Sequence, residues 1–291
     1  MKALFFSDID GTFLDYDKYC YDESIKGLEL LKENSIPLIL VSSKTFDEIL
    51  LLVNELDLHY PFSFENGTGL AYPVDENVGA TDSVARKNGT DFAHQSDERG
   101  KYSVELEGPG VAELLKFLPM IEKFLMMEKS LIKNLRPITS LSEEEIMSIT
   151  KLDAASAYRT KTRMTTLAFI ADGGLLSDDE VDKINILLQD YSLAVIKGGR
   201  FNHLLPSNAK KGSAVKKIIE FYKRKFNDEI LTASAGDSQN DIPMFEATDF
   251  QYIIKRPNGS FVNYTKGHIM KSPGPAGFSE AVYDFIIRLK A

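Results

Sequence analysis

The chain has a single cysteine, an excess of acidic over basic side chains and no long apolar run. One cysteine, Cys20, cannot form an internal disulfide, so nothing in the chain requires an oxidising compartment. The 34 basic and 43 acidic side chains give a net charge of −9. That charge repels phosphate backbones and anionic lipids, which argues against nucleic acid or a membrane surface as a partner. No apolar run reaches the roughly 18 residues of a membrane helix, and the first one breaks at Ser7 and Asp8, too early for a signal peptide. We therefore expect a cytoplasmic protein.

The order of apolar segments predicts an α/β fold. Continuous apolar or small-residue runs, typical of strands that are buried on both faces, occupy residues 2–7, 37–41 and 230–235. Between and after them, residues 23–34, 46–57, 210–226 and 276–289 carry apolar side chains at helical spacing. Strands that alternate with helices form parallel sheets covered on both faces. The expected core is a doubly wound, Rossmann-like parallel sheet.

The middle of the chain has a different pattern. Residues 75–108 are polar and rich in turn formers, and we interpret them as a connector. Three helical patterns follow: one at residues 110–127, one that begins after a capping box formed by Ser142 and Glu145, and one from Ser177 to about residue 190. Extended segments are expected at 165–170 and 193–197. The simplest arrangement is a catalytic core made of residues 1–80 and 205–291, with an α+β domain of residues 81–204 inserted into it.

Polar clusters follow three of the predicted strands. They are the segments 8–12 (DIDGT), 42–45 (SSKT) and 236–241 (GDSQND). Open α/β sheets bind ligands at the carboxyl ends of their strands, so we expect these clusters to meet. Asp8 and Asp10 point to the same side of their strand, and Asp237, together with Asp241, would make the site strongly anionic. Oxygen ligands without histidine or cysteine suit Mg²⁺.

Other side chains in these segments suit a phosphate group. Ser42, Ser43 and Lys211, at the start of a predicted helix, offer hydroxyl and ammonium donors. We therefore expect Asp8 to attack phosphorus and form an aspartyl-phosphate, while Asp10 protonates the leaving oxygen and then activates water. Each motif alone is more often a turn, a helix cap or ordinary surface than part of a catalytic site. It is their joint occurrence after three buried strands that indicates catalysis.

Together these motifs resemble those of the haloacid dehalogenase-like phosphatases, in the branch with a large type C2 cap inserted between the second and third motifs. The resemblance implies that Asp8 is the nucleophile and that Ser42 and Lys211 bind the phosphoryl group. It further implies that Asp8, the backbone carbonyl of Asp10, and Asp237 hold Mg²⁺, supported by Asn240 and Asp241 around that shell. The inserted domain would then be the cap that determines substrate specificity.

Within these phosphatases, the sequence is similar to the mannosyl-3-phosphoglycerate phosphatase family. The similar segments are 41–45 (VSSKT), 65–67 (ENG), 141–146 (LSEEEI), 149–152 (ITKL) and 198–204 (GGRFNHL). The resemblance implies a glycosyl-phosphoglycerate substrate, whose carboxylate Lys44, Arg163 and Arg200 could pair with. Asn66 and His203 are further candidates for substrate binding, although His203 could equally pack beneath the cap. Arg163 is followed by 164–168 (MTTLA) rather than by the family's acidic signature, so the sequence leaves the sugar open.

Two other functions remain open at this point. A generalist sugar-phosphate phosphatase or a phosphotransferase would use the same residues and differ only in its substrate or in the acceptor of the phosphoryl group. A receiver-like phosphoacceptor module also gathers acids, a hydroxyl and a lysine at the end of a doubly wound sheet. Such a module needs neither Asp10 with its adjoining glycine and threonine nor an inserted domain. We therefore expect a phosphatase that acts on a small phosphorylated molecule.

Overall fold

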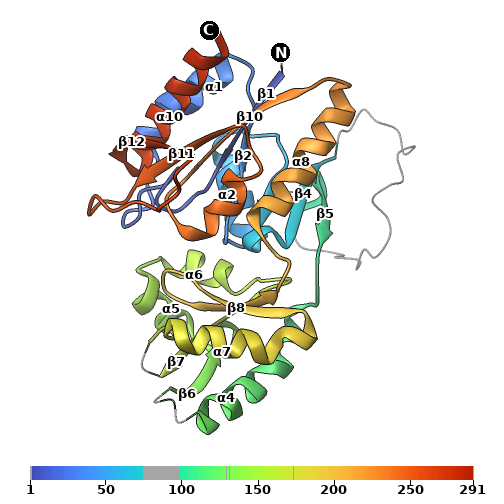
Figure 1. Ribbon diagram of the computed structural model, residues 1–291, viewed down its shortest axis with the longest axis vertical. Coiled ribbons are helices and arrows are strands. Elements are labelled where there is room, and N and C mark those ends of the chain that lie inside the picture. Colours follow the sequence, from blue (N-terminus) through green and yellow to red (C-terminus); the bar gives the residue numbers. More distant parts are fainter. Residues whose placement is uncertain (1, 75–98, 129, 131, 173, 291) are drawn as a thin grey trace. The chain divides into compact units, whose positions relative to one another are not determined.

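The computed structural model describes residues 2–74, 99–128, 130, 132–172 and 174–290, and these form two compact units (Figure 1). The first unit comprises Met1–Ser43, Val53–Glu105 and Lys210–Ala291, and the second comprises Lys44–Leu52 and Leu106–Ala209. The helix α2 (Phe46–Glu55) has most of its residues in the second unit. The predicted boundary at residues 80 and 81 lies outside the described residues.

The first unit is built on a five-stranded parallel sheet with the strand order β12-β11-β10-β1-β2. These strands are β1 (Lys2–Ser7), β2 (Leu38–Leu40), β10 (Ile230–Gly236), β11 (Phe250–Lys255) and β12 (His268–Pro273). The helices that belong to this unit are α1 (Ile25–Glu33), α8 (Lys211–Phe226), α9 (Ile242–Phe245) and α10 (Gly274–Lys290). The three strands expected from the sequence are therefore confirmed, at the centre and one edge of the sheet.

Side chains of β1 show why this sheet is covered on both faces. Leu4 and Phe6 belong to the apolar cluster that contains Val215 of α8. Phe5 lies between them in the chain and makes edge contacts with the rings of Phe278 and Phe285 of α10. Since successive side chains of a strand point to opposite faces, α8 and α10 cover opposite sides of the sheet. This is the predicted doubly wound arrangement.

A smaller sheet of the first unit lies near the end of β2. It contains β3 (Phe62–Phe64), β4 (Gly69–Pro73) and β5 (Tyr102–Leu106), and β3 and β4 are joined by the short 3-10 turn Glu65–Gly67. An isolated parallel bridge connects Val41 to Ser63, next to β2. The bridge places the turn Glu65–Gly67 beside the carboxyl end of the main sheet. The sequence analysis did not predict this sheet.

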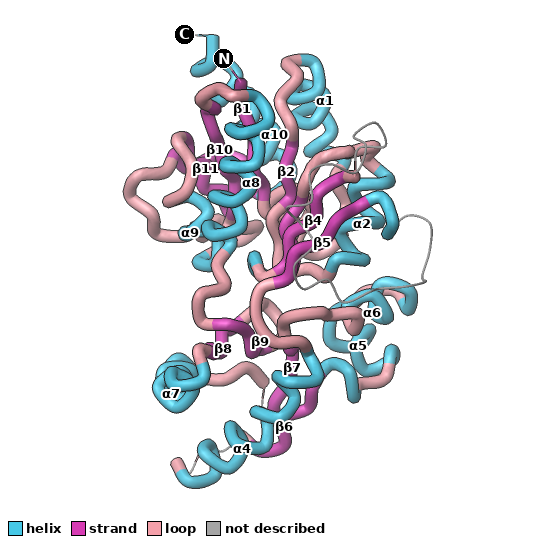
Figure 2. The backbone as a smooth tube through the Cα atoms, turned by 90° about the vertical axis from the view of Figure 1, so that its right-hand side faces the viewer, coloured by secondary structure: helices cyan, strands magenta, loops and turns pink. Residues whose placement is uncertain are grey.

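The second unit contains an antiparallel sheet with the order β6-β7-β9-β8 (Figure 2). Its strands are β6 (Lys133–Pro137), β7 (Leu167–Asp172), β8 (Leu193–Lys197) and β9 (Asn202–Pro206). Its helices are α3 (Val111–Leu114), α4 (Leu118–Met127), α5 (Glu143–Thr150), α6 (Ala154–Thr160) and α7 (Asp178–Leu188). The unit is therefore α+β, as the sequence predicts for the inserted domain.

Alternation along β7 divides the second unit into two apolar layers. Leu167 and Phe169 pack with side chains of α4 and α7, whereas Ala168, between them, packs with α5 and α6 through Ile146 and Ala157. The sheet therefore has a helix pair on each face. This alternation also applies to β9, where Leu204 belongs to the α4 and α7 layer, so the neighbouring His203 points to the α5 and α6 side.

Helix ends of the second unit follow local sequence signals closely. Ser142 and Glu145 form the predicted capping box at the start of α5, and Ser177 with Glu180 forms another at the start of α7. The helical pattern expected at 110–127 is confirmed as α3 and α4, which are joined by the 3-10 turn Leu115–Phe117. Pro119 has no N–H to donate to Leu115, so an unbroken helix would lose that hydrogen bond.

Candidate active site

The carboxyl ends of β1 and β10 bring Asp8 and Asp237 together. β1 pairs with β10 along its whole length, and the N–H of Asp8 continues this pairing by donating to the carbonyl of Ala235 at 3.0 Å. An oxygen of Asp8, one of Asp237 and one of Asp241 all lie within 4.8 Å of one another. Residues more than two hundred positions apart therefore share one site, as expected for strand ends of a parallel sheet.

Lys211 connects two of these acids. It is the first residue of α8, and its Nζ lies 2.6 Å from Oδ1 of Asp8 and 2.6 Å from Oδ1 of Asp241. Only 1 % of its side chain is exposed to solvent. Gly212 allows this helix end to lie close to the neighbouring loop, because a Cβ at that position would stand 2.1 Å from the carbonyl oxygen of Pro243. The helix start is thereby held where Lys211 meets both carboxylates.

Asp241 also holds the loop that carries Asp237. Its Oδ2 accepts hydrogen bonds from the N–H groups of Asp237 at 3.1 Å and of Ser238 at 3.0 Å, and from the Ser238 hydroxyl at 2.8 Å. The Ser238 hydroxyl also contacts Oδ1 of Asn240. Gly236 is tightly enclosed, since a Cβ there would lie 2.6 Å from the side chain of Asp241. Asp241 thereby fixes the loop that carries Asp237, and the supporting role of Asn240 and Asp241 around a metal ion stays a prediction.

The three carboxylates suit a divalent cation. All three side chains are buried, and each offers a hard oxygen ligand. The turn after β1 approaches them closely, because a Cβ on Gly11 would lie 3.1 Å from Oδ2 of Asp237. Gly11 has a φ of +78°, which favours glycine, so both its backbone conformation and its close surroundings disfavour a larger residue. A group of oxygen ligands without nitrogen or sulfur fits Mg²⁺ better than Zn²⁺.

Burial and neighbouring negative charge disfavour the charged forms of Asp8 and Asp237. Burial raises the pKa of Asp8 well above its usual range, and the charges of Asp241 and Asp237 add to this effect, while Lys211 opposes it. Burial and the charge of Asp241 likewise raise the pKa of Asp237 to about 6, although Arg256 opposes the shift. The pKa of Lys211 is raised: its burial acts to lower it, but Asp241 and Asp8 outweigh that effect. The site is therefore short of positive charge.

Asp10 lies on the tight turn that follows Asp8. The N–H of Gly11 donates to the carbonyl of Leu14 at 2.9 Å, and the N–H of Leu14 donates to the carbonyl of Ile9 at 2.7 Å. The side chain of Asp10 is partly buried, in contrast to that of Asp8. These bonds keep Asp10 on the turn that contacts Asp237. Its role as acid and base stays a prediction.

A second turn connects Ser42 to the start of α8. The N–H of Ser42 donates to the carbonyl of Ser63 at 3.0 Å, and the N–H of Asn66 donates to the carbonyl of Ser42 at 2.9 Å. Asn66 has a φ of 62°, and a Cβ on Gly67 would lie 2.5 Å from the carbonyl oxygen of Lys210. The predicted phosphate-binding residue Ser42 and the residue before Lys211 therefore flank one turn. The buried amide of Asn66 has no hydrogen-bond partner among the residues that the structure describes.

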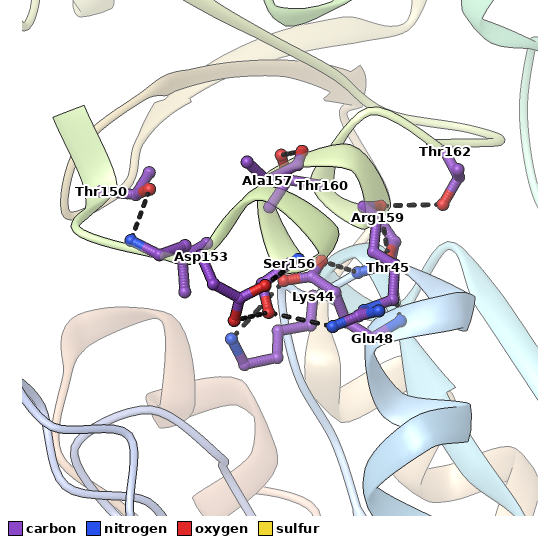
Figure 3. Close-up of polar contacts among 11 residues, drawn as sticks. Lys44, Thr45, Glu48, Thr150, Asp153, Ser156, Ala157, Arg159, Thr160 and Thr162 are labelled. Carbon is purple, nitrogen blue, oxygen red and sulfur yellow. Dashed lines mark hydrogen bonds and ion pairs between the residues drawn. The ribbon is translucent and has the colours of Figure 1, made fainter. Parts of the chain in front are cut away.

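Lys44 belongs to a polar network of the second unit (Figure 3). It forms an ion pair with Glu48, 3.6 Å away, at the start of α2. Glu48 accepts a hydrogen bond from the N–H of Thr45 at 2.8 Å, and the Thr45 hydroxyl donates to the carbonyl of Arg159 at 3.0 Å. The guanidinium of Arg159, at the end of α6, donates to the Ser156 hydroxyl at 2.9 Å. Lys44 and Arg159 are therefore fixed near each other within this unit.

The structure also brings Arg163 and His203 together in the second unit. Burial lowers the pKa of His203 to about 3, and the charge of nearby Arg163 contributes. His203 is therefore neutral at physiological pH, and its Nδ1 has no hydrogen-bond partner in the described part of the chain. Arg163 donates from Nη1 to the hydroxyl of Thr166 at 2.9 Å. The pair lies on the α5 and α6 side of the sheet, the side to which His203 points.

The two remaining candidates lie in loops. Ser43 directly follows Ser42 at the end of β2, and Arg200 lies on the turn between β8 and β9. That turn is closed by the N–H of Gly198, which donates to the carbonyl of Phe201 at 2.8 Å. The positions of Ser43 and Arg200 in these loops do not test whether they contact substrate. Their predicted contacts with substrate stay predictions.

A comparison with known protein families shows to which family the chain belongs. A family model described as haloacid dehalogenase-like hydrolase matches residues 5–260, which is most of the chain. The chain belongs to the haloacid dehalogenase-like hydrolases. The resemblance found in the motifs at residues 8–12 and 236–241 is thus confirmed. In the described residues of this hydrolase, no helix is long and apolar enough to cross a membrane.

Two curated relatives match this hydrolase over nearly their whole length. A glucosyl-3-phosphoglycerate/mannosyl-3-phosphoglycerate phosphatase of Methanococcoides burtonii is 34% identical, with 98% of each chain covered. A protein of the same name from Persephonella marina is 29% identical over 96% of this chain and 95% of the relative. Among solved structures, a protein of Thermoplasma acidophilum has a TM-score of 0.63 and 17% identity, covering 100% of this chain and 99% of that one. The last likeness shows a shared fold.

One contact of this hydrolase was missed by the sequence analysis. Arg256 directly follows β11, and its Nε lies 3.0 Å from Oδ2 of Asp237. Because β11 is parallel to β10, both strands end at the same edge of the sheet. A prediction of β11 as a further strand would have pointed to Arg256. The sequence analysis did not identify this strand, and so its terminal residue received no role.

Proposed function

We propose that this hydrolase is a Mg²⁺-dependent phosphatase that cleaves a phosphomonoester through an aspartyl-phosphate on Asp8. The observation that carries the proposal is the position of Lys211, 2.6 Å from both Asp8 and Asp241, beside the carboxylate of Asp237. This arrangement keeps a permanent cation next to the nucleophile. Such a cation attracts a phosphate dianion that the carboxylates alone would repel.

Each residue has a defined task in this mechanism. A carboxylate oxygen of Asp8 forms a bond to phosphorus, and Asp10 gives its proton to the departing alcohol oxygen. Asp10 then removes a proton from water, whose oxygen attacks the same phosphorus atom and releases Asp8 and inorganic phosphate. Ser42 and Lys211 bind the phosphoryl oxygens throughout. Mg²⁺ would be held by Asp8, Asp237 and the backbone carbonyl of Asp10, and Asn240 and Asp241 would support these ligands. When bound, the ion would neutralise the charge that develops on the phosphoryl group.

We further propose a glycosyl-3-phosphoglycerate as the substrate, with either a glucosyl or a mannosyl group. The support is the activity for which the two relatives are named, and this chain matches them over 98% and 96% of its length. Such a substrate carries a carboxylate in addition to its phosphate. Lys44, Arg163 and Arg200 of the second unit are the proposed counter-charges, while Ser43, Asn66 and the neutral His203 would bind its other polar atoms. A phosphoacceptor signalling module is disfavoured, because the family is one of hydrolases.

Phosphate release from a panel of substrates tests the proposal. The panel contains glucosyl- and mannosyl-3-phosphoglycerate, sucrose phosphate, a hexose phosphate and a nucleotide. A charge-assisted hydrogen bond to the carboxylate contributes about 1.5–3 kcal/mol, so we expect kcat/KM for a glycosyl-3-phosphoglycerate to be about tenfold to a hundredfold higher than for the others. Similar modest values on every substrate would indicate a generalist instead. Transfer of the phosphoryl group to a second sugar in preference to water would indicate a phosphotransferase.

Removal of divalent cations is expected to abolish this activity. Without the ion, the carboxylates of Asp8 and Asp237 repel the substrate phosphate, and burial together with the charge of Asp241 raises the pKa of both. We expect excess chelator to reduce phosphate release by at least about a hundredfold, and Mg²⁺ to restore it. Recovery with Zn²⁺ alone would contradict the assignment of an oxygen-ligand site for Mg²⁺.

A further inference from the structure

The ion pair between Arg256 and Asp237 has no part in the proposed chemistry. The Nε of Arg256 donates to Oδ2 of Asp237 at 3.0 Å. The side chain of Asp237 is 5% exposed, whereas that of Arg256 is 45% exposed. A short loop holds the backbone of Arg256, since its N–H donates to the carbonyl of Ser260 and its carbonyl accepts from the N–H of Gly259, both at 2.8 Å. An exposed cation is thus anchored beside a buried acid.

Each acid of the cluster forms an ion pair with one of two cationic side chains. Lys211 contacts Asp8 and Asp241, and Arg256 contacts Asp237. Lys211 is buried and is held by two partners, so it is fixed in place. The guanidinium of Arg256 is partly exposed to solvent and pairs with Asp237 through Nε. Asp237 is therefore the member of the trio whose neutralising partner is accessible to solvent.

A divalent ion and this guanidinium are attracted to the same carboxylate. If the ion displaces Arg256, the free energy of the ion pair is lost; if Arg256 stays, the two positive charges repel each other. In both cases the arginine lowers the affinity for the ion. In the metal-free protein the same charge has the opposite effect, because it compensates an acid that would otherwise be buried beside Asp241 and Asp8 without a partner.

We propose that Arg256 is a positioning residue that serves as the counter-cation of Asp237 in the metal-free protein and so weakens the binding of a divalent ion. This inference rests on the metal site of the proposed function. Arg256 pairs with Asp237 in the metal-free state of the site and is in competition with the ion in the metal-bound state. The arginine stabilises the folded chain before the ion binds, and the ion must compete with it.

Binding of Mg²⁺ alone, without substrate, tests the proposal by titration calorimetry on the full-length chain. A half-exposed ion pair is worth about 0.2–1 kcal/mol, so we expect Arg256→Gln to lower the Kd for Mg²⁺ by about 1.5-fold to fivefold. We expect the metal-free variant to melt at a lower temperature than the wild type and to gain more from added Mg²⁺. Arg256→Lys, which keeps the charge, should bind Mg²⁺ more nearly as the wild type does.

Lys255→Gln is the matched control, because it removes a positive charge from the preceding residue, while the ion pair of Asp237 is made by Arg256. We expect its Kd for Mg²⁺ to stay within the error of the wild-type value. An unchanged or higher Kd in Arg256→Gln would overturn the role of Arg256 and leave the phosphatase proposal intact. A wild-type chain that releases phosphate but does not bind Mg²⁺ would overturn the metal site and this inference with it.

Discussion

Phosphate release is expected to fall by at least about a thousandfold when Asp8 is replaced by asparagine, because the amide cannot form the covalent bond to phosphorus. The substitution conserves volume at a buried position, and Lys211 keeps its ion pair with Asp241. We therefore expect the far-UV circular dichroism spectrum to remain that of the wild type. The measurement is the rate of phosphate release at saturating Mg²⁺ and substrate.

A control for Asp8→Asn is available in the same loop. Asp17→Asn removes a carboxylate from an exposed position nine residues further along the chain, and it should release phosphate at the wild-type rate. Wild-type activity in Asp8→Asn would exclude the covalent mechanism. A loss of circular dichroism signal in Asp8→Asn would mean instead that the buried carboxylate is needed for folding.

Replacement of Lys211 by methionine should have the largest effect on stability. The methionine has a similar length but no charge, so Asp8 and Asp241 would remain buried with their compensating cation removed. Breaking a buried ion pair from one side costs about 3–5 kcal/mol, and we expect the free energy of unfolding of the metal-free protein to fall by that amount. The chain has no tryptophan, so urea unfolding is best followed by circular dichroism.

Lys210→Met separates this effect from a simple loss of charge. Lys210 is exposed and directly precedes Lys211, so its replacement should change the free energy of unfolding by less than about 0.5 kcal/mol. Equal stabilities for Lys210→Met and Lys211→Met would contradict the compensating role of Lys211. We also expect Lys211→Met to lose phosphatase activity, since its charge attracts the substrate phosphate.

The strands and acidic residues at the catalytic end of the core were largely predictable, because the sequence patterns that indicate them extend over only a few neighbouring residues. An apolar run covered on both faces indicates a parallel strand, and β1 begins and ends where the sequence analysis placed it. The polar residues directly after such runs must then lie at the same sheet edge. This reasoning located Asp8 and Asp237, whose carboxylates the structure brings together with that of Asp241. The capping box at Ser142 and the helix start at Ser177 were visible for the same reason.

Other features were missed because their signals depend on distant parts of the chain. β11 and β9 were not predicted as strands, and in the structure they pair with β10 and β7. The partner of Arg256 therefore could not be read from the neighbouring residues. The same holds for His203, whose neutral state results from burial beside Arg163.

The amino-acid sequence alone determined the fold class, the family motifs and the order in which acids, hydroxyls and a lysine follow buried strands. Only the tertiary structure decided which charges compensate each other: Lys211 with Asp8 and Asp241, and Arg256 with Asp237. The physical reason is that strand and cap preferences act over a few residues, whereas the energy of a charge depends on burial and on every other charge within a few ångströms. Those neighbours come from segments that are remote in the chain and meet only when it folds.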